Sequence, residues 1–337
     1  MASVSDTLRA LISGLVAFAL ALALAPLVLA AAKKLKARQT VLHYVEQHAG
    51  KSGTPTMGGW IFILAASAST LIFGMQRPAV VAVGIALAYG VVGFLDDFIK
   101  VHFKQNEGLK PYQKITAQLG ISAIAAAFTL LNPSVGTSIH LPFSGIYLNL
   151  SYGIIPFTMF VYVALTNAVN LTDGLDGLAG WTSFVFFAVF AAVILSLQQS
   201  AEASGELERA QGLAALAVYC LSFGGAVLGF LCLNTYPAKI IMGDTGALAL
   251  GGAMASAAVF SREPLLILLA CIMPIVSCIS VILQVAYYKL TKKRIFLMAP
   301  FHHHLEKKGW HESKITAVYV VISIIAGVLT LIAAGVK

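Results

Sequence analysis

Residues 167–180 read NAVNLTDGLDGLAG and lie between two strongly apolar runs of the chain. Asn170, Asp173 and Asp176 are spaced three apart, so on a helical turn they share one face. An Asp at the centre of a bilayer costs about 2.5–3.5 kcal/mol even on insertion scales. The stretch therefore predicts a polar site at a membrane surface, or else a glycine-rich turn whose aspartates cap helices.

The composition excludes an ordinary soluble domain. Of 337 residues, 59% are hydrophobic and 11% are charged, and the mean hydropathy is +0.87. The four cysteines all lie in apolar runs, which argues against a disulfide framework or a zinc site. We expect an all-α polytopic membrane protein whose single domain is the helical bundle of residues 1–337.

Apolar runs of about 20 residues, the length of one crossing, predict ten spans. They lie near residues 8–31, 58–76, 79–96, 114–131, 153–170, 177–197, 211–232, 246–261, 264–288 and 314–336. Pro274 falls inside the ninth run, where the missing helix hydrogen bond is expected to bend the segment and open a lateral groove to lipid. Alternation and turn residues in 132–152 predict a small extracytoplasmic β-hairpin.

Basic residues divide unequally between alternate connections. Of 22 Lys and Arg residues, 17 fall in one set of connections and 5 in the other. The cytoplasmic side keeps the excess, so both termini are expected outside. Five of six Asp and seven of eight His residues fall on the inner side, which places the function at the cytoplasmic face. The net charge of +8 is then a topology signal and an attraction to anionic lipid, not a sign of nucleic-acid binding.

Two inner stretches could bind phosphate or metal. Residues 48–60, HAGKSGTPTMGGW, place Lys51 before a glycine- and threonine-rich helix start, which predicts a phosphate cradle or an ordinary interfacial turn. Asp96 and Asp97 end the third run; adjacent helical residues point about 100° apart, so one could face a metal and the other a proton. A plain pair of capping carboxylates is the alternative.

Two further inner stretches complete the polar face. Asn234 and Asp244 flank the start of the eighth run, where a carboxylate between Gly243 and Thr245 suits magnesium or an N-cap. The segment MAPFHHHLEKKGWHESK (298–314) carries three consecutive histidines. Consecutive residues do not share a helix face, so contact with a phosphate is favoured over a three-histidine zinc site. With the basic residues 289–294, the segment could lie on the inner leaflet.

Together these stretches predict phosphate chemistry at one membrane face. Transfer between two phosphorylated reactants needs a divalent ion, anchoring donors and a carboxylate for the proton or the metal. A transporter would instead carry ionisable groups along a path through the membrane. Such mid-span charges are scarce here.

The same residues resemble a known family, the polyprenyl-phosphate N-acetylhexosamine-1-phosphate transferases. The matching strings are collinear and spread over nearly the whole chain: GTPTMGG (53–59), FLDDFIK (94–100), NAVNLTDGLDGLAG (167–180), MGDTGALALGG (242–252) and PFHHHLEKKGW (300–310). The last string favours the branch with a muramoyl-pentapeptide donor over a sister enzyme that transfers GlcNAc-1-phosphate.

The resemblance implies a ten-helix homodimer in the bacterial cytoplasmic membrane, with its active site facing the cytoplasm. It implies Mg²⁺-dependent transfer of phospho-MurNAc-pentapeptide from UDP-MurNAc-pentapeptide to undecaprenyl phosphate, which yields lipid I and UMP. It places the paired aspartates at Asp96 and Asp97 and the metal ligand at Asp244, with His302 and His303 also at the catalytic centre. It places the substrate contacts at Lys51, Asn170, Asp173, Asp176, Asn234, Ile241, Gln284 and His304.

Two mechanisms fit this set of residues. In a direct attack, Asp96 takes or orients the proton of undecaprenyl phosphate, while Lys51, His302 and His303 offset charge as UMP departs. The alternative is a covalent phospho-sugar intermediate on Asp97 or Asp244. Ile241 stands where family members often carry an aromatic residue, so it can pack on uracil but cannot stack as a ring does.

Overall fold

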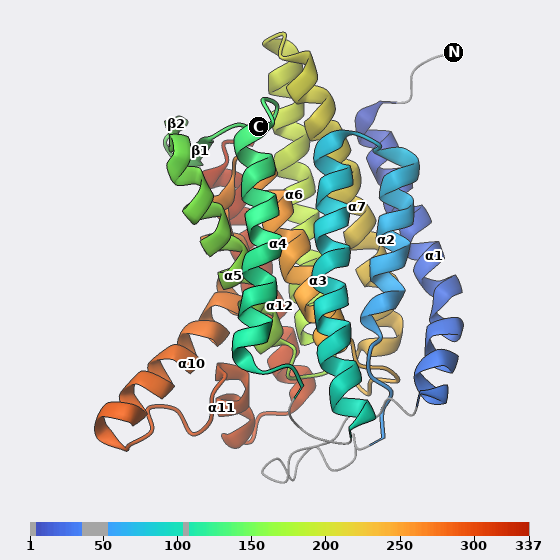
Figure 1. Cartoon of the computed structure of the whole chain (residues 1–337), viewed down its shortest axis with the longest axis vertical. Coiled ribbons are helices and arrows are strands. Elements are labelled where there is room, and N and C mark those ends of the chain that lie inside the picture. Colours follow the sequence, from blue (N-terminus) through green and yellow to red (C-terminus); the bar gives the residue numbers. More distant parts are fainter. Residues whose placement is uncertain (1–4, 36–52, 104–107, 337) are drawn as a thin grey trace.

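The computed structural model describes residues 5–35, 53–103 and 108–336, and this part of the chain is a helical bundle (Figure 1). The helices are α1 (Asp6–Lys34), α2 (Gly59–Phe73), α3 (Arg77–His102), α4 (Pro111–Leu131), α5 (Ile154–Thr172), α6 (Leu178–Ala203), α7 (Leu207–Asn234), α8 (Gly243–Phe260), α9 (Ile267–Ala270), α10 (Ile272–Thr291), α11 (Phe301–Lys307) and α12 (Glu312–Ala333). Short 3₁₀ turns occur at Ser151–Gly153 and Pro264–Leu266.

Eight helices in the described ranges are long and apolar enough to cross a membrane: α1, α3, α4, α5 with its preceding turn, α6, α7, α10 and α12. The other two expected runs form α2, which has only 15 residues, and α8, which has 18. The prediction of an all-α polytopic membrane protein is confirmed. The chain is a multi-pass membrane protein.

Helix α8 lies at the centre of the bundle, and its small side chains allow its neighbours to approach closely. Every residue from Thr245 to Phe260 is buried. A Cβ built on Gly93 of α3 would lie 2.1 Å from the carbonyl oxygen of Asp244, and one on Gly59 of α2 would lie 2.3 Å from Gly246. Small residues at such crossings are what bring membrane helices into backbone contact. They set the distance between the ends of α3 and α8, where the carboxylates lie.

The ninth apolar run is broken as expected. The helix stops at Ala270 and α10 starts at Ile272, two residues before Pro274. Proline has no N–H for the carbonyl of Ala270, four residues earlier, and its ring crowds that carbonyl. Beyond the break, α10 leans away from the bundle and α11 lies between its far end and the other helices (Figure 1).

The predicted hairpin is also confirmed. Strands β1 (Ser138–Leu141) and β2 (Ile146–Asn149) pair antiparallel, with Ser138 opposite Asn149. The hairpin turn is tied to the end of α12, because the Phe143 N–H donates to the Ala333 carbonyl at 2.9 Å. The hairpin, the start of α1 and the end of α12 thus share one end of the bundle (Figure 1).

Candidate active site

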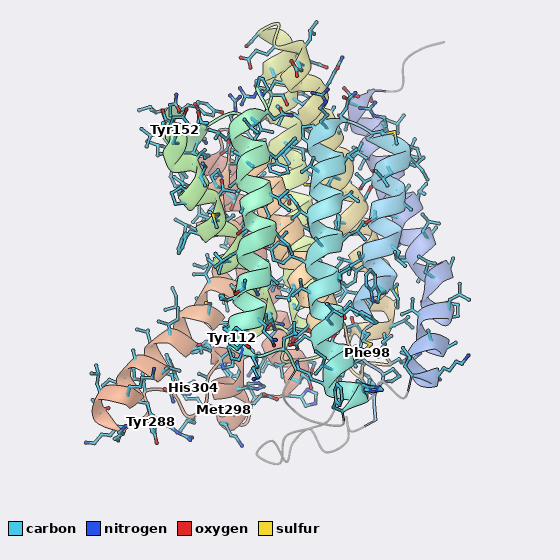
Figure 2. The ribbon with its side chains drawn as sticks, in the orientation of Figure 1. Phe98, Tyr112, Tyr152, Tyr288, Met298 and His304 are labelled. Atoms are coloured by element: carbon cyan, nitrogen blue, oxygen red, sulfur yellow. The ribbon has the colours of Figure 1, made fainter. Side chains whose placement is uncertain are left out.

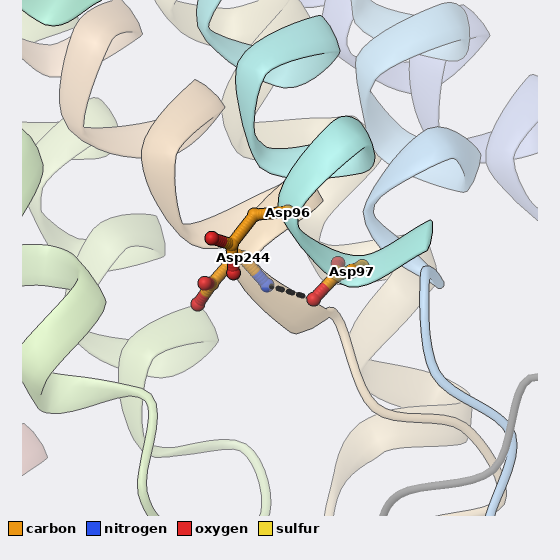
Figure 3. Close-up of side chains that lie close together, drawn as sticks. All are labelled: Asp96, Asp97 and Asp244. Atoms are coloured by element: carbon orange, nitrogen blue, oxygen red, sulfur yellow. Dashed lines mark hydrogen bonds between the residues drawn. The ribbon is translucent and has the colours of Figure 1, made fainter. Parts of the chain in front are cut away.

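Three carboxylates meet at the other end of the bundle. Asp96 and Asp97 lie in the last turns of α3, and Asp244 lies in the first turn of α8. One oxygen from each lies within 4.8 Å of the others. Asp96 and Asp97 are almost fully buried, at 3% and 5% exposure. Figure 3 shows the Asp96 carboxylate beside that of Asp244, and the Asp97 carboxylate pointing to another side of α3. Asp96 and Asp97 point in different directions because adjacent residues of a helix are about 100° apart.

Asp97 caps α8 from a neighbouring helix. One Asp97 oxygen accepts a hydrogen bond from the Asp244 N–H at 3.2 Å (Figure 3). The other accepts from the Thr245 N–H at 2.9 Å and the Thr245 hydroxyl at 2.7 Å. Helix α8 has no side-chain cap of its own at Met242. The first N–H groups of a helix need an acceptor, and a negative charge there is favourable. Asp97 supplies both and so fixes the place of Asp244.

Asp244 is surrounded by donors. Its Oδ2 pairs with Lys100 Nζ at 2.9 Å and with Lys114 Nζ at 3.0 Å, and its Oδ1 accepts from Asn170 Nδ2 at 2.6 Å. Lys100 also pairs with Asp96 Oδ2 at 2.6 Å. The two ammonium groups, from α3 and α4, lie opposite three carboxylates and reduce the repulsion among them.

The sequence analysis used Lys100 and Lys114 only to predict which side of the membrane the connections face, and did not place them at the site. A local signal for Lys100 exists, because Asp96 and Lys100 stand four apart in FLDDFIK, the spacing of an ion pair on one helix face. No local pattern indicates Lys114, which reaches Asp244 only because α4 packs beside α3 and α5. The N–H of Leu109, at 2.8 Å from Asp96 Oδ1, was missed for the same reason.

His302 and His303 lie on the short α11, which packs near the turn after α5. His302 is completely buried, and a Cβ on Gly174 would lie 2.2 Å from its Nε2. Glycine at 174 is therefore needed for this contact, which brings α11 against the stretch that opened the sequence analysis. His303 Nδ1 lies 2.5 Å from Glu306 Oε2, within the same helix.

His304 contacts the connection between α10 and α11. Its Nδ1 accepts a hydrogen bond from the Leu297 N–H at 3.1 Å, and its ring packs with Phe296 and Phe301. Desolvation, followed by the charge of Lys308, lowers the pKa of His304. A lowered pKa favours the neutral ring, which can accept this hydrogen bond at Nδ1.

Asp176 and Asn234 join loops at the same end of the bundle. Asp176 Oδ2 accepts from the Ala238 N–H at 2.9 Å, and its own N–H donates to Glu312 Oε1. Asn234 Oδ1 accepts from the Gly177 N–H at 3.1 Å, while its Nδ2 donates to the Ile240 carbonyl at 2.9 Å. Both side chains tie the turn between α5 and α6 to the connection between α7 and α8.

The remaining predicted residues are spread around this end. Asp173 follows the last residue of α5, where its N–H bonds back to the carbonyl of Val169. Ile241 is half-buried and pairs through its backbone with Pro55 and Gly58, at 2.8 and 2.9 Å. The Gln284 amide bonds to the backbone of 295–296, away from the carboxylates. Lys51 lies outside the described residues.

Comparison with known proteins identifies the chain's relatives. Residues 79–262 match the family model described as Glycosyl transferase family 4, and residues 51–63 match the phospho-N-acetylmuramoyl-pentapeptide-transferase signature 1. A phospho-N-acetylmuramoyl-pentapeptide-transferase of Clostridium novyi (strain NT) is 41% identical over 317 residues, 93% of each chain. The chain belongs to the phospho-N-acetylmuramoyl-pentapeptide-transferase family.

Two other phospho-N-acetylmuramoyl-pentapeptide-transferases are similar to this chain over nearly its whole length. The enzyme so named from Clostridioides difficile (strain 630) is 39% identical over 330 residues, 95% of this chain and 96% of the relative. The one from Clostridium perfringens (strain 13 / Type A) is 40% identical over 314 residues, 92% of this chain and 94% of the relative. The chain is therefore a membrane-bound transferase, and the family resemblance expected from its motifs is confirmed.

Proposed function

We propose that this protein transfers phospho-MurNAc-pentapeptide from UDP-MurNAc-pentapeptide to undecaprenyl phosphate, giving lipid I and UMP for peptidoglycan synthesis. The observation that supports this most directly is the meeting of Asp96, Asp97 and Asp244 with two lysines at one end of the bundle, within a chain of this family. The names of the relatives favour a muramoyl-pentapeptide donor over UDP-GlcNAc. A transporter is disfavoured because the described carboxylate group lies at one end of the bundle.

The carboxylates fit a magnesium ion. Mg²⁺ prefers hard oxygen ligands and is usually bound through one or two carboxylates, with substrate phosphates and water completing its shell. Asp244 would hold it, with Asp96 as its neighbour, and would give up part of its pairing with the Lys100 and Lys114 ammonium groups to do so. Asp97 is less suited, because its oxygens accept the backbone N–H groups that begin α8. A bound Mg²⁺ supplies positive charge that lowers the repulsion between the diphosphate and an incoming phosphate.

The chain's own residues then act on the two substrates. Lys100 and Lys114 orient Asp244 and add positive charge where phosphates must approach. Asp96, held by the Leu109 N–H, orients or accepts the proton of undecaprenyl phosphate. His302 and His303, with Lys51, offset the charge that develops on UMP as it leaves. Asn170, Asp173, Asp176, Asn234, Ile241, Gln284 and His304 form the wider substrate surface in this proposal.

The active site is proposed to face the cytoplasm, in the bacterial inner membrane. This orientation rests on the Lys and Arg excess in the connections at the carboxylate end and on the hairpin at the opposite end. The whole bundle forms one domain, and the working unit is a homodimer.

The donor assay tests the proposed function. Detergent-purified protein is mixed with undecaprenyl phosphate, Mg²⁺ and either UDP-MurNAc-pentapeptide or UDP-GlcNAc, and UMP release is measured. We expect release from the muramoyl donor alone, and its loss when EDTA removes divalent ions. Release from UDP-GlcNAc only would assign the chain to the sister activity, and release from neither donor would refute the proposal.

Isotope exchange distinguishes the two mechanisms. Three donors on α8 hold both Asp97 oxygens, and two lysines and Asn170 engage the Asp244 carboxylate. Neither carboxylate is free to form a bond to phosphorus without losing these contacts, so we expect direct attack. Labelled UMP should then not exchange into UDP-MurNAc-pentapeptide when undecaprenyl phosphate is absent. Exchange at a rate near turnover would establish a covalent intermediate.

A further inference from the structure

A buried polar layer joins three helices, deeper in the bundle than the carboxylates. Asn167 of α5 donates from Nδ2 to Gln118 Oε1 of α4 at 2.7 Å, and the Tyr89 hydroxyl of α3 donates to the Gln118 carbonyl at 3.2 Å. Gln118 and Tyr89 are completely buried. Helix α4 begins at the carboxylate end, where Figure 2 labels Tyr112, and packs against both α3 and α5. Gln118 therefore lies where the three helices meet.

The layer lies one helical turn from the site. Gln118 follows Lys114 by four residues, and Asn167 precedes Asn170 by three, so each pair shares one face of its helix. Lys114 Nζ lies 3.4 Å from Asn170 Oδ1 and 3.0 Å from Asp244 Oδ2. Helices α4 and α5 are thus joined twice. One contact lies in the site, and the other lies roughly 6 Å further along α4, at 1.5 Å per residue.

The deeper contact is the more rigid of the two. A Lys side chain has a flexible four-carbon stem, so the position of the Lys114 ammonium depends on where α4 lies. Gln118 has no contact with solvent, so water cannot replace its bond to Asn167. Gln118 Nε2 has no hydrogen-bond partner among the described residues. A buried amide that is only partly satisfied lowers stability, and a role in fixing the register of packed helices accounts for its presence.

We propose that Gln118 is a positioning residue, whose bond to Asn167 fixes α4 against α5 and so keeps the Lys114 ammonium on Asp244. The proposal rests on the proposed function, in which Lys114 orients Asp244 and adds positive charge beside the phosphates. Gln118 is completely buried, so it acts through Lys114 and not on a substrate. Without its amide, α4 is able to turn or slide against α5, and Lys114 loses its place while the carboxylates of α3 keep theirs.

The chain offers a matched pair of variants on one face of α4. Gln118→Leu removes the acceptor and fills its space with an apolar side chain of similar size, while Asn167 keeps its own bond to the Val163 carbonyl at 2.7 Å. The control is Ser122→Ala, one turn further along the same face. Ser122 is also completely buried, and its hydroxyl donates to the Leu119 carbonyl of the same helix at 2.9 Å. Both variants remove a buried polar group, but the first alone removes the bond between α4 and α5.

Acylation of Lys114 tests the proposal without substrates. Each detergent-purified protein is treated with limiting acetic anhydride, the remaining amines are acylated with the deuterated reagent, and the extent at each lysine is read by mass spectrometry. The Lys114 side chain is 19% exposed, so displacement from Asp244 increases its contact with the reagent, and exposed Lys110 at the start of α4 is the internal reference. In Gln118→Leu the ratio of Lys114 to Lys110 acylation should rise about threefold, the factor that corresponds to an interhelical hydrogen bond of ~0.6 kcal/mol in a membrane. The control should keep the wild-type ratio.

Turnover supplies a second readout that a purely structural residue would not move in the same way. UMP release by Gln118→Leu should be about tenfold slower, because a misplacement of ~1 Å in an active site can cost up to about 100-fold. Adding Gln118→Leu to Lys114→Gln should slow release no further, since both changes remove the same ammonium from the site. The exchange of Gln118→Asn with Asn167→Gln keeps the combined length of the two amides, so it should restore both the acylation ratio and turnover.

Four results would overturn the proposal. They are an unchanged acylation ratio in Gln118→Leu, an equal rise in Ser122→Ala, additive losses of turnover with Lys114→Gln, and no recovery in the exchange variant. If Gln118→Leu does not fold, Gln118→Asn, whose amide is one methylene too short, repeats the comparison. Acylation needs no donor or magnesium, so a failed donor assay with the expected rise at Lys114 would refute only the proposed function.

Discussion

Replacement of Asp244 by Asn is expected to abolish turnover while the fold is retained. The change keeps the shape of the side chain but removes the charge that would hold Mg²⁺ and that pairs with Lys100 and Lys114. Loss of several kcal/mol of charge stabilisation corresponds to a fall in kcat of about 10³-fold or more. UMP release from the muramoyl donor is the measurement.

Asp6→Asn is the matched control for this change. Asp6 lies in the first turn of α1, at the hairpin end of the bundle, where it pairs with Arg9 at 2.8 Å. Its loss removes the same charge at a half-exposed surface pair, where the effect on stability is about 0–1 kcal/mol. Near-normal UMP release by the Asp244→Asn protein would contradict the metal assignment.

Gly93→Ala is expected to destabilise the bundle and to impair catalysis together. The added methyl group would lie 2.1 Å from the backbone oxygen of Asp244, where no side chain can move aside. Helices α3 and α8 must then separate, at a cost of about 3 kcal/mol or more for overpacking. Their separation would also pull Asp97 away from the N–H groups that it caps, so we expect a lower unfolding temperature and at least about tenfold slower UMP release.

Gly84→Ala is the control in the same helix. Its Cβ would meet nothing within 4 Å, so the variant should unfold at the wild-type temperature or slightly above it, since Ala is the better helix former. The close-contact argument is wrong if the two alanine variants unfold at the same temperature and turn over equally fast.

Much of the fold was predictable from the sequence, because it depends on patterns that are local. Each of the ten apolar runs contains a helix, the hairpin occurs in 132–152, and Pro274 accounts for the break before α10. The concentration of carboxylates at one end also followed from local sequence, since Asp96, Asp97 and Asp244 all stand at the ends of apolar runs on the predicted inner side.

The partners of these carboxylates were not predictable in the same way. Asp97 caps α8 because α3 and α8 cross closely at Gly93, and Lys114 pairs with Asp244 because α4 packs beside α3 and α5. Neither arrangement leaves a periodic signal in the sequence. Asn234 and Gln284 were expected at the substrate, yet each has its amide engaged with backbone groups. Their roles at the substrate stay predictions.

Because α10 leans away from the bundle, the surrounding bilayer influences the tilt of this helix. Only 22% of the residues in its most apolar stretch are buried within the protein, so most of this helix is open to the surrounding membrane. The tilt of such a helix responds to the thickness of the membrane, at fractions of a kcal/mol per ångström of mismatch. Since His302 is buried against Gly174, α11 stays with the central helices, and a thinner or thicker membrane would act on the connection that joins α10 to the three consecutive histidines.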